Sequence, residues 1–306
     1  MRWARLGQVF NAEQRSSWMD SYAYVPTAYQ IDEERIRVFL AFRDKEQVGR
    51  IGWVDVLAND PTQVIEFSRE PSLDIGRVGA FDDNGVTPLA VVAEGTGLRL
   101  YYAGWQLTPR ARYLLFTGLA ISTDQGQRFT RLQETPILDR SPDELILRSG
   151  AHVLKDEEMG IWKMWYAVAS GFVDVGGKQV PTYHMAYLES VDGISWPQKG
   201  KTVLTPLAPD EYGFGRSFIR KKNGRYELWL SARSHSKNYV IDYATSADGV
   251  HWQRHAGYGG LDHAAEGWDS QMTCFPSIIE NKHGTFMFYN GNGFGETGFG
   301  VAKLVE

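Results

Sequence analysis

Carboxylates stand at matched places in the sequence, shortly before short apolar segments. Asp20 and Asp82 each lie six residues before a proline, Asp83 follows directly, and Asp269 precedes a third segment of this kind. Several like charges brought to one place are costly unless they are used. Two carboxyl groups that meet across a bond can serve as acid and as base or nucleophile, which is the chemistry of glycosidic cleavage.

Two arginines, Arg148 and Arg216, fall within the corresponding segments further along the chain. A guanidinium binds carboxylate or phosphate through a planar fork. Beside acidic groups, the two arginines could hold an anionic sugar such as a uronic acid, an ulosonic acid or a sugar phosphate. The alternative is that each arginine pairs with a neighbouring aspartate, so that neither charge is buried alone.

These residues belong to a pattern that recurs along the whole chain. The short apolar segments are "YAYVP", "NGVTP", "RSGAH", "FGRSF" and "MTCFP", which end at residues 26, 88, 152, 218 and 276. Each is followed by an aromatic strand, namely "IRVFLAFRD", "LRLYYAGW", "IWKMWYAVAS", "YELWLSARS" or "TFMFYNGN". Such self-similarity at a fixed period indicates a repeat architecture.

A turn also recurs, as "STDQGQRF", "SVDGISW" and "SADGVHW". An aspartate caps a turn of this kind through its own side chain, so we assign Asp124, Asp192 and Asp248 to turn formation. The turn is expected to join the third and fourth strands of a unit, and its aromatic residue to pack between neighbouring units.

Alternating strands with tight turns between them predict antiparallel four-stranded sheets. The last unit has only three strands, and "WARLGQVF" at residues 3–10 is a spare strand that would complete it. We therefore predict an all-β fold in which residues 1–306 form a single five-bladed β-propeller closed by the N-terminal strand. The alternative is an irregular β-sandwich.

Composition limits the classes of partner. The formal net charge is −5, which implies no general attraction to nucleic acid or to an anionic membrane. No apolar run is long enough to span a bilayer, and the single cysteine, Cys274, cannot form an internal disulfide. These features predict a soluble, cytoplasmic protein. The histidines show no metal-ligand spacing, so neither a metal nor a cofactor is expected.

The blade pattern, the "SxDGxxW" turn and the "YYAGW"-type second strand resemble the five-bladed glycosidase superfamily. This group contains the family 43 arabinanases and xylosidases, the invertases and levansucrases, and the mannoside phosphorylases. "WMDSYAYVP" is faintly similar to the "WMNDPNG" of invertases, and "FDDNGVTP" to the start of the second blade in several of these families. The resemblance covers nearly the whole chain, but no complete family signature is present.

The resemblance implies roles for the acidic residues. It makes Asp20 the base or nucleophile, and Asp82 or Asp83 the carboxylate that orients or tunes, with the choice between them open. Where the families have a blade-three glutamate as acid, this sequence departs from them. Glu144 could supply the acid if its loop folds inward, and it could equally be a solvated loop charge.

The loops between second and third strands are expected to share one face with the acidic residues. There Trp105, Phe172, His235 and Phe294 could stack on a sugar ring, although plain packing explains any single one. Glu296 and Asp269 add carboxylates to the same rim.

Two functions follow from these patterns. The first is a carbohydrate-active enzyme, a glycoside hydrolase, transglycosidase or phosphorylase acting on a carbohydrate or sugar-derived small molecule. The second is a non-catalytic glycan-binding propeller. The converging charges favour the enzyme, and the missing blade-three glutamate favours the binding protein.

Overall fold

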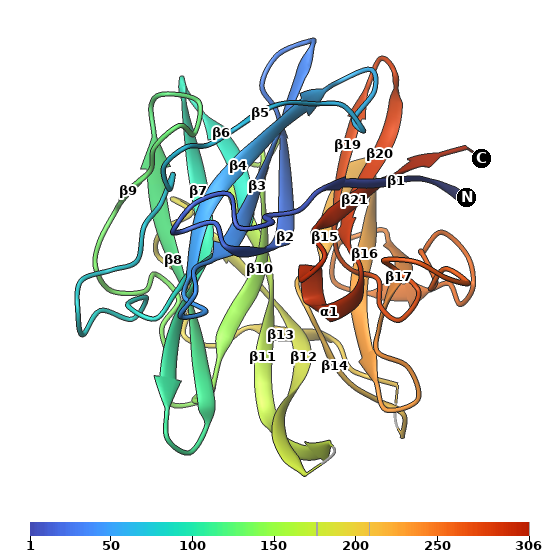
Figure 1. The fold of residues 1–306 in the computed structure, drawn as a ribbon. Coiled ribbons are helices and arrows are strands. Elements are labelled where there is room, and N and C mark those ends of the chain that lie inside the picture. Colours follow the sequence, from blue (N-terminus) through green and yellow to red (C-terminus); the bar gives the residue numbers. More distant parts are fainter. Residues whose placement is uncertain (176, 208, 306) are drawn as a thin grey trace.

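The computed structural model describes residues 1–175, 177–207 and 209–305, which are almost entirely β-strands and turns. The chain makes groups of antiparallel strands, one after another (Figure 1). The first group contains β2 Ser21–Gln30, β3 Arg35–Arg43, β4 Gly49–Leu57 and β5 Val64–Phe67. The second contains β6 Val86–Glu94, β7 Gly97–Thr108, β8 Arg112–Ser122 and β9 Thr130–Arg131.

The third group contains β10 Arg148–Asp156, β11 Ile161–Val175, β12 Lys178–Ser190 and β13 Lys201–Leu204. A single bridge between Arg148 and Phe116 joins it to the second group. The fourth group contains β14 Glu211–Phe214, β15 Phe218–Lys222, β16 Arg225–Ser234, β17 Tyr239–Ser246 and β18 Trp252–Arg254. The segment "FGRSF", expected to be one inner strand, is therefore split, because residues 215–217 leave the ladder between β14 and β15.

The fifth group contains β19 Cys274–Asn281, β20 Gly284–Asn290, β21 Phe299–Leu304 and β1 Trp3–Phe10. Its strand order is β1-β21-β20-β19, and β1 runs antiparallel to β21 from Trp3↔Leu304 to Phe10↔Phe299. A short helix, α1 Asn292–Gly295, lies between β20 and β21. The two ends of the chain thus lie side by side, as Figure 1 shows.

The larger hydrophobic clusters lie between consecutive strand groups rather than within one. Phe39 of β3 and Phe129, which follows the first repeated turn, meet edge to face with their ring centroids 5.5 Å apart. The last group packs against the first in the same way, since Phe10 and Phe42 meet at 6.2 Å. Inner strands are also in contact in succession, β2 with β6, β6 with β10, β10 with β15, β15 with β19, and β19 with β2.

The repeated turns form hydrogen bonds to the neighbouring strand group, and their aspartates cap the turns as predicted. In the turn after β17, Ser246 Oγ donates to Asp248 Oδ1 at 3.0 Å, and Gly249 N donates to Ser246 Oγ at 2.9 Å. The Gly249 carbonyl then accepts a hydrogen bond of 2.6 Å from the indole of Trp165 in the preceding group. Equivalent bonds run from Tyr101 to Gly193 and from Arg37 to Gln125. Asp124, Asp192 and Asp248 are therefore turn residues.

Candidate functional site

One face of the molecule carries both the segments that lead into the inner strands and the loops that follow the second strands; we call it the funnel face. Backbone hydrogen bonds join the two, as from Asp20 N to Arg43 O at 2.9 Å and from His235 N to Asp210 O at 3.0 Å. Gln271 N reaches Asn292 Oδ1 at 2.7 Å in the fifth group. The shared face predicted from the sequence is therefore present.

Asp82 is held by residues of its own strand group. Its side chain is completely buried, and its Oδ2 accepts hydrogen bonds from Arg131 Nε of β9 at 2.7 Å and from the Tyr102 hydroxyl of β7 at 3.0 Å. The carboxylate thus ties the segment before β6 to the second and fourth strands of its own group. Asp82 Oδ2 is thus engaged inside the protein while Oδ1 has no hydrogen-bond partner, and the orienting or tuning role expected of Asp82 stays a prediction.

Asp269 is engaged in the same way in the fifth group. Its Oδ2 accepts from Arg5 Nε of β1 at 2.7 Å and from the Tyr289 hydroxyl of β20 at 2.8 Å, and the residue is only 2% exposed. A carboxylate ahead of the inner strand, an arginine on the outermost strand and a tyrosine on the second strand therefore recur. We call this arrangement the carboxylate clamp. Asp269 is thus held by β1 and β20, and its expected place at the ligand site stays a prediction.

Glu144 and Arg148, assigned above to catalysis and to ligand binding, form a variant of this clamp in the third group, in which the arginine lies on the inner strand β10 rather than on the outermost strand. Arg148 Nε lies 2.6 Å from Glu144 Oε2, which also accepts from the Tyr166 hydroxyl at 2.7 Å. Glu144 Oε1 accepts from Gly200 N at 2.9 Å. The loop does fold inward, but it delivers Glu144 into a clamp, so neither Glu144 as acid nor Arg148 as an anion-binding group is retained.

Arg216 is also removed from the ligand site. The guanidinium is buried and donates to the backbone carbonyls of Pro26, Phe275 and Pro276, so it links the fourth group to the first and the fifth. Burial lowers its pKa to about 9. Beside it His152 is buried in contact with the Phe218 ring at 4.7 Å, and burial, together with the Arg216 charge, lowers the pKa of His152 to about 3.

Of the carboxylates predicted from the sequence, Asp20, Asp83 and Glu296 are not held in clamps. Asp83 is half-buried and accepts a hydrogen bond from Gly79 N at 2.8 Å. Asp20 is half-buried, and Glu296, which follows α1, is exposed. Within the described ranges, the Asp20 and Glu296 carboxylates form no hydrogen bond or ion pair. Asp20 is thus the free carboxylate that lies directly before an inner strand.

Aromatic side chains line the same face in an unbroken sequence of contacts. Tyr22 and Tyr24 of β2 meet at 6.0 Å, and Thr87 lies between the Tyr24 hydroxyl and Trp105 Nε1, at 3.4 and 2.9 Å. Trp105 then meets Tyr113 at 5.2 Å. The sequence predicted Trp105 as a rim residue, and the structure places it within this row.

The row continues across the third and fourth groups. The hydroxyls of Tyr113 and Tyr183 lie 3.2 Å apart. The guanidinium of Arg233, at the end of β16, lies over the rings of Tyr183, Tyr212 and Tyr239 at 4.9, 4.4 and 5.7 Å. We call the set Tyr22, Tyr24, Trp105, Tyr113, Tyr183, Tyr212 and Tyr239 the aromatic row. The sequence does not single out Arg233, because its tyrosine neighbours come from strands that are distant along the chain.

The other predicted rim aromatics lie nearby. Phe294 of α1 contacts Tyr239 with ring centroids 5.6 Å apart, whereas Phe172 is 39% exposed and has no ring contact within the described part of the chain. His235 is exposed and stacks on Tyr212 at 4.7 Å. The Tyr212 ring therefore has His235 and Arg233 as neighbours.

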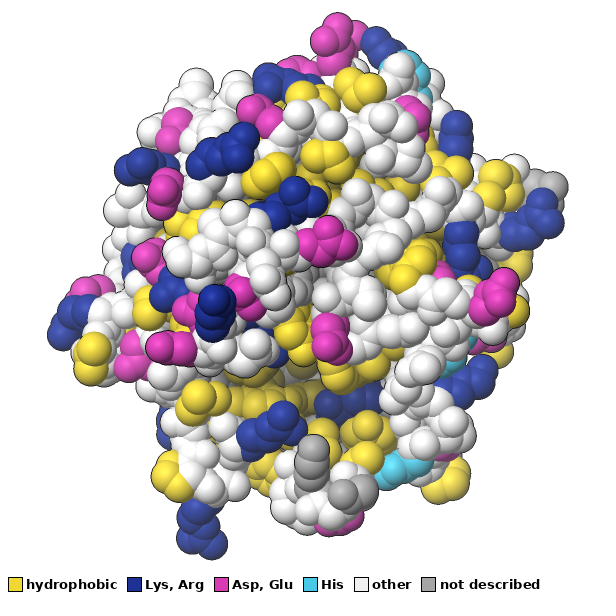
Figure 2. Space-filling view, in the orientation of Figure 1, with side chains coloured by type: hydrophobic (Ala, Val, Ile, Leu, Met, Phe, Trp, Pro, Cys, Tyr) yellow, Lys and Arg dark blue, Asp and Glu magenta, His cyan; other side chains and the backbone are white. Residues whose placement is uncertain are grey.

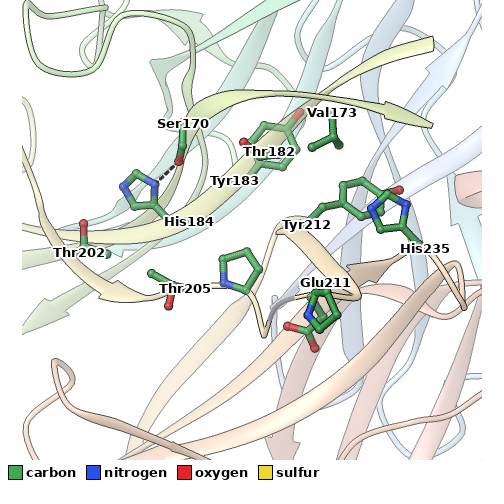
Figure 3. A pocket seen from close by; sticks show the side chains of 12 residues that line it. Ser170, Val173, Thr182, Tyr183, His184, Thr202, Thr205, Glu211, Tyr212 and His235 are labelled. Carbon is green, nitrogen blue, oxygen red and sulfur yellow. Dashed lines mark hydrogen bonds between the residues drawn. The ribbon is translucent and has the colours of Figure 1, made fainter. Parts of the chain in front are cut away.

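A cavity of ≈ 440 Å³ opens between the third and fourth groups (Figure 3). One wall carries Ser170 and His184, whose Oγ and Nδ1 lie 2.6 Å apart, and the opposite wall carries Tyr212 and His235. Glu211 lies at the edge of the cavity and forms two bonds of 2.7 Å with Arg254. The cavity is lined by both polar and apolar side chains and shares Tyr183 and Tyr212 with the aromatic row.

Figure 2 shows Lys and Arg side chains interspersed with Asp and Glu over the face in view, without a large area of one sign. No group of three or more metal-binding side chains is found in residues 1–175, 177–207 and 209–305. None of the helices in that part of the chain has the length and apolarity to cross a membrane.

Several solved structures with a similar arrangement of strands are glycoside hydrolases. The chain superposes on a thermostable family 43 glycoside hydrolase with a TM-score of 0.67 and 16% identity, over 94% of this chain and 90% of that one. It matches the xylosidase/arabinofuranosidase CoXyl43 from a compost metagenome, solved with xylotriose, with a TM-score of 0.66 and 15% identity, over 100% and 95%. The Bombyx mori family 32 β-fructofuranosidase BmSUC1 matches with a TM-score of 0.61 and 15% identity, over 93% and 60%.

At such identities the likeness is one of fold, and it confirms the predicted similarity to the propeller glycosidase superfamily. No family model matches the sequence. The chain is 30% identical over 304 residues to "Uncharacterized protein Rv1502" of Mycobacterium tuberculosis H37Rv, with 99% of each covered, and equally to MT1551 of strain CDC 1551. The chain belongs to the family of these mycobacterial proteins.

Proposed function

We propose that the protein is a carbohydrate-active enzyme of the glycoside hydrolase type, built as a single five-bladed propeller. Each strand group is one blade, and β1 closes the ring. The succession of contacts from β2 through β6, β10, β15 and β19 back to β2 supports this arrangement. So does the packing of the fifth group against the first, through Phe10 and Phe42.

The observation that carries the function is the aromatic row on the funnel face, which begins at Tyr22, two residues after the free carboxylate of Asp20. The half-buried rings of the row, those of Tyr22, Trp105, Tyr113 and Tyr212, can meet a sugar ring, whereas Tyr24, Tyr183 and Tyr239 are buried behind them. Asp20 stands directly before the first inner strand, the place at which the resembling families have a base or nucleophile. It is free of the interactions that occupy Asp82, Glu144 and Asp269.

We keep an acidic sugar as the proposed substrate and a cytoplasmic location as the proposed place of action. The acidic sugar is supported by Arg233, which replaces Arg148 and Arg216 in this role. Asp83, Glu296, Trp105 and His235 stay as proposed contributors on the same face. The identity of the general acid is left open by this proposal, since Glu144 is engaged in its clamp.

The test is turnover of a panel of nitrophenyl glycosides, neutral and acidic, by the wild type and by Asp20→Asn. A carboxylate that acts in proton transfer contributes about 10²–10⁴-fold, so kcat should fall by roughly that factor while binding persists. Glu66→Gln on β5, an exposed carboxylate of the same blade, is the matched control and should behave as wild type. Equal turnover by wild type and Asp20→Asn would exclude Asp20 from the reaction.

The second candidate is a glycan-binding propeller without catalysis. The engagement of Asp82, Glu144 and Asp269 in clamps favours it, because it leaves few carboxylates for two-group acid and base chemistry. In that case the wild type binds glycans on the aromatic row but releases no nitrophenol from any of them, and Asp20→Asn changes affinity alone.

A further inference from the structure

Among the buried arginines of the described residues, Arg216 and Arg233 lack a carboxylate partner, and Arg233 makes the fewest hydrogen bonds. These buried arginines are Arg37, Arg99, Arg148, Arg216 and Arg233. The first three each form an ion pair with a carboxylate, at 2.7, 2.5 and 2.6 Å. Arg216 donates to three carbonyl oxygens. Arg233 has no carboxylate within ion-pair distance among the described residues, and its Nη2 donates to a single carbonyl, that of Pro181.

The guanidinium of Arg233 therefore keeps unused hydrogen-bonding capacity. Its Nε is buried without any partner, and the side chain as a whole is 8% exposed. Burying a charge without a counter-ion is expensive, and such groups are normally paired. The faces of the tyrosine rings around it offer cation–π attraction, which compensates only part of that cost.

Tyr183 and Tyr239, two of the tyrosines around Arg233, are neutral and cannot act as its counter-ions. Burial raises the pKa of Tyr239 to about 12 and holds that of Tyr183 well above its usual value. In the pair formed by Tyr113 and Tyr183, one hydroxyl donates to the other at 3.2 Å, so one phenolic proton is left over to donate elsewhere. Cation and donor together make a receptor for an oxyanion.

We propose that Arg233 binds an oxyanion carried by the sugar ligand, either a carboxylate or a phosphate, beside the hydroxyls of Tyr113 and Tyr183. The inference rests on the proposed function, since it takes the aromatic row as the sugar site. It makes Arg233 the residue that selects acidic over neutral sugars. The oxyanion replaces the missing counter-ion, while the sugar ring lies against the aromatic row.

The test is calorimetric titration of the whole protein with glucuronate, N-acetylneuraminate, glucose 6-phosphate and glucose. We expect at least one acidic sugar to bind about tenfold or more tightly than glucose, in keeping with the strength of a charge-assisted bond. Binding of the carboxylate sugars identifies a carboxylate as the oxyanion, and binding of glucose 6-phosphate identifies a phosphate. A wild type that binds no acidic probe, or binds acidic and neutral sugars equally, overturns the inference.

Arg233→Lys keeps the charge but loses the planar fork, so the preference for the acidic sugar should fall roughly tenfold. Arg225→Lys, at the other, exposed end of β16, is the matched control and should keep it. If Arg233→Lys does not fold, the wild type is titrated with the methyl ester of the uronate, which removes the charge from the ligand instead of changing the protein. Undiminished binding of the ester contradicts the proposal.

The two proposals fail separately. Loss of the acidic preference in Arg233→Lys together with unchanged turnover in Asp20→Asn supports the anion site and overturns the role of Asp20. Loss of turnover in Asp20→Asn together with an unchanged preference in Arg233→Lys supports the role of Asp20 and overturns the anion site.

Discussion

At the scale of the residue, the carboxylates divide by whether the protein already uses them. Asp82 and Asp269 each accept hydrogen bonds from a tyrosine hydroxyl and an arginine of their own strand group. Glu144 accepts from the Tyr166 hydroxyl and forms an ion pair with Arg148. A buried carboxylate with two such partners is fixed in position by its own strand group. Asp20 has none of these partners, which is why the proposed chemistry is assigned to it.

The clamp predicts a large effect for Arg131→Met. The substitution leaves Asp82, which is wholly buried, without its cation, and breaking a buried ion pair from one side costs about 3–5 kcal/mol. Arg77→Met is the matched control, because its pair with Glu134 is 73% and 58% exposed and such pairs contribute about 0–1 kcal/mol. Urea unfolding of both variants measures the difference. Similar losses in the two would contradict the clamp.

At the scale of the element, the repeated turn joins neighbouring strand groups through hydrogen bonds and packing. Gly193 has a φ of 69°, a conformation that side chains with a Cβ rarely adopt. Its carbonyl accepts from Tyr101, and a Cβ at this position would lie 2.7 Å from Trp162 and 2.8 Å from Arg99 Nη1. The turn therefore needs glycine both for its backbone conformation and for close packing.

Gly193→Ala separates these two requirements when it is compared with Gly160→Ala. Gly160 has a φ of 66°, but a Cβ there meets nothing within 4 Å. Gly160→Ala should lower the free energy of unfolding by about 1–2 kcal/mol through backbone strain alone. Gly193→Ala should lose roughly 1–3 kcal/mol more, because the methyl group is forced into packed side chains. Denaturant midpoints that are equal would show that packing at the turn is unimportant.

At the scale of the whole molecule, the first strand joins the two ends of the chain. Trp3 of β1 is 6% exposed, meets Trp229 at 6.1 Å, and donates from its indole to Gly259 O at 2.8 Å. Arg5 of the same strand completes the clamp on Asp269. Ten residues at the N-terminus thus cover a sheet edge, fill a core cluster and neutralise a buried acid.

Trp3→Ala should therefore destabilise the entire fold by about 3–5 kcal/mol, as for other buried aromatic truncations. Leu6→Ala in the same strand is the control, since Leu6 is 41% exposed and should cost much less. Deletion of residues 1–10 should go further and cause aggregation, because β21 would become an open edge. A melting temperature that is unchanged by the deletion would contradict closure by β1.

The sequence by itself determined the repeating strand pattern, the turns and the place of the N-terminal strand. Strand alternation, Asp-Gly turns and a spare first strand are local signals, because each depends on neighbours within a few residues. They were sufficient to predict which known proteins have a similar fold and that the loops after the second strands share a face with the segments before the inner strands. They also predicted the turn roles of Asp124, Asp192 and Asp248.

Only the tertiary structure decided which charged residues are free. Asp82 and Arg131 are 49 residues apart, and Asp269 and Arg5 are 264 apart, so no local pattern reveals that they pair. Arg233 was missed for the same reason. Its lack of a counter-ion is a property of its surroundings, which come from β8, β12, β16 and β17 together. Pairing and burial are set by distance in space, whereas sequence spacing fixes only the strand on which a residue lies.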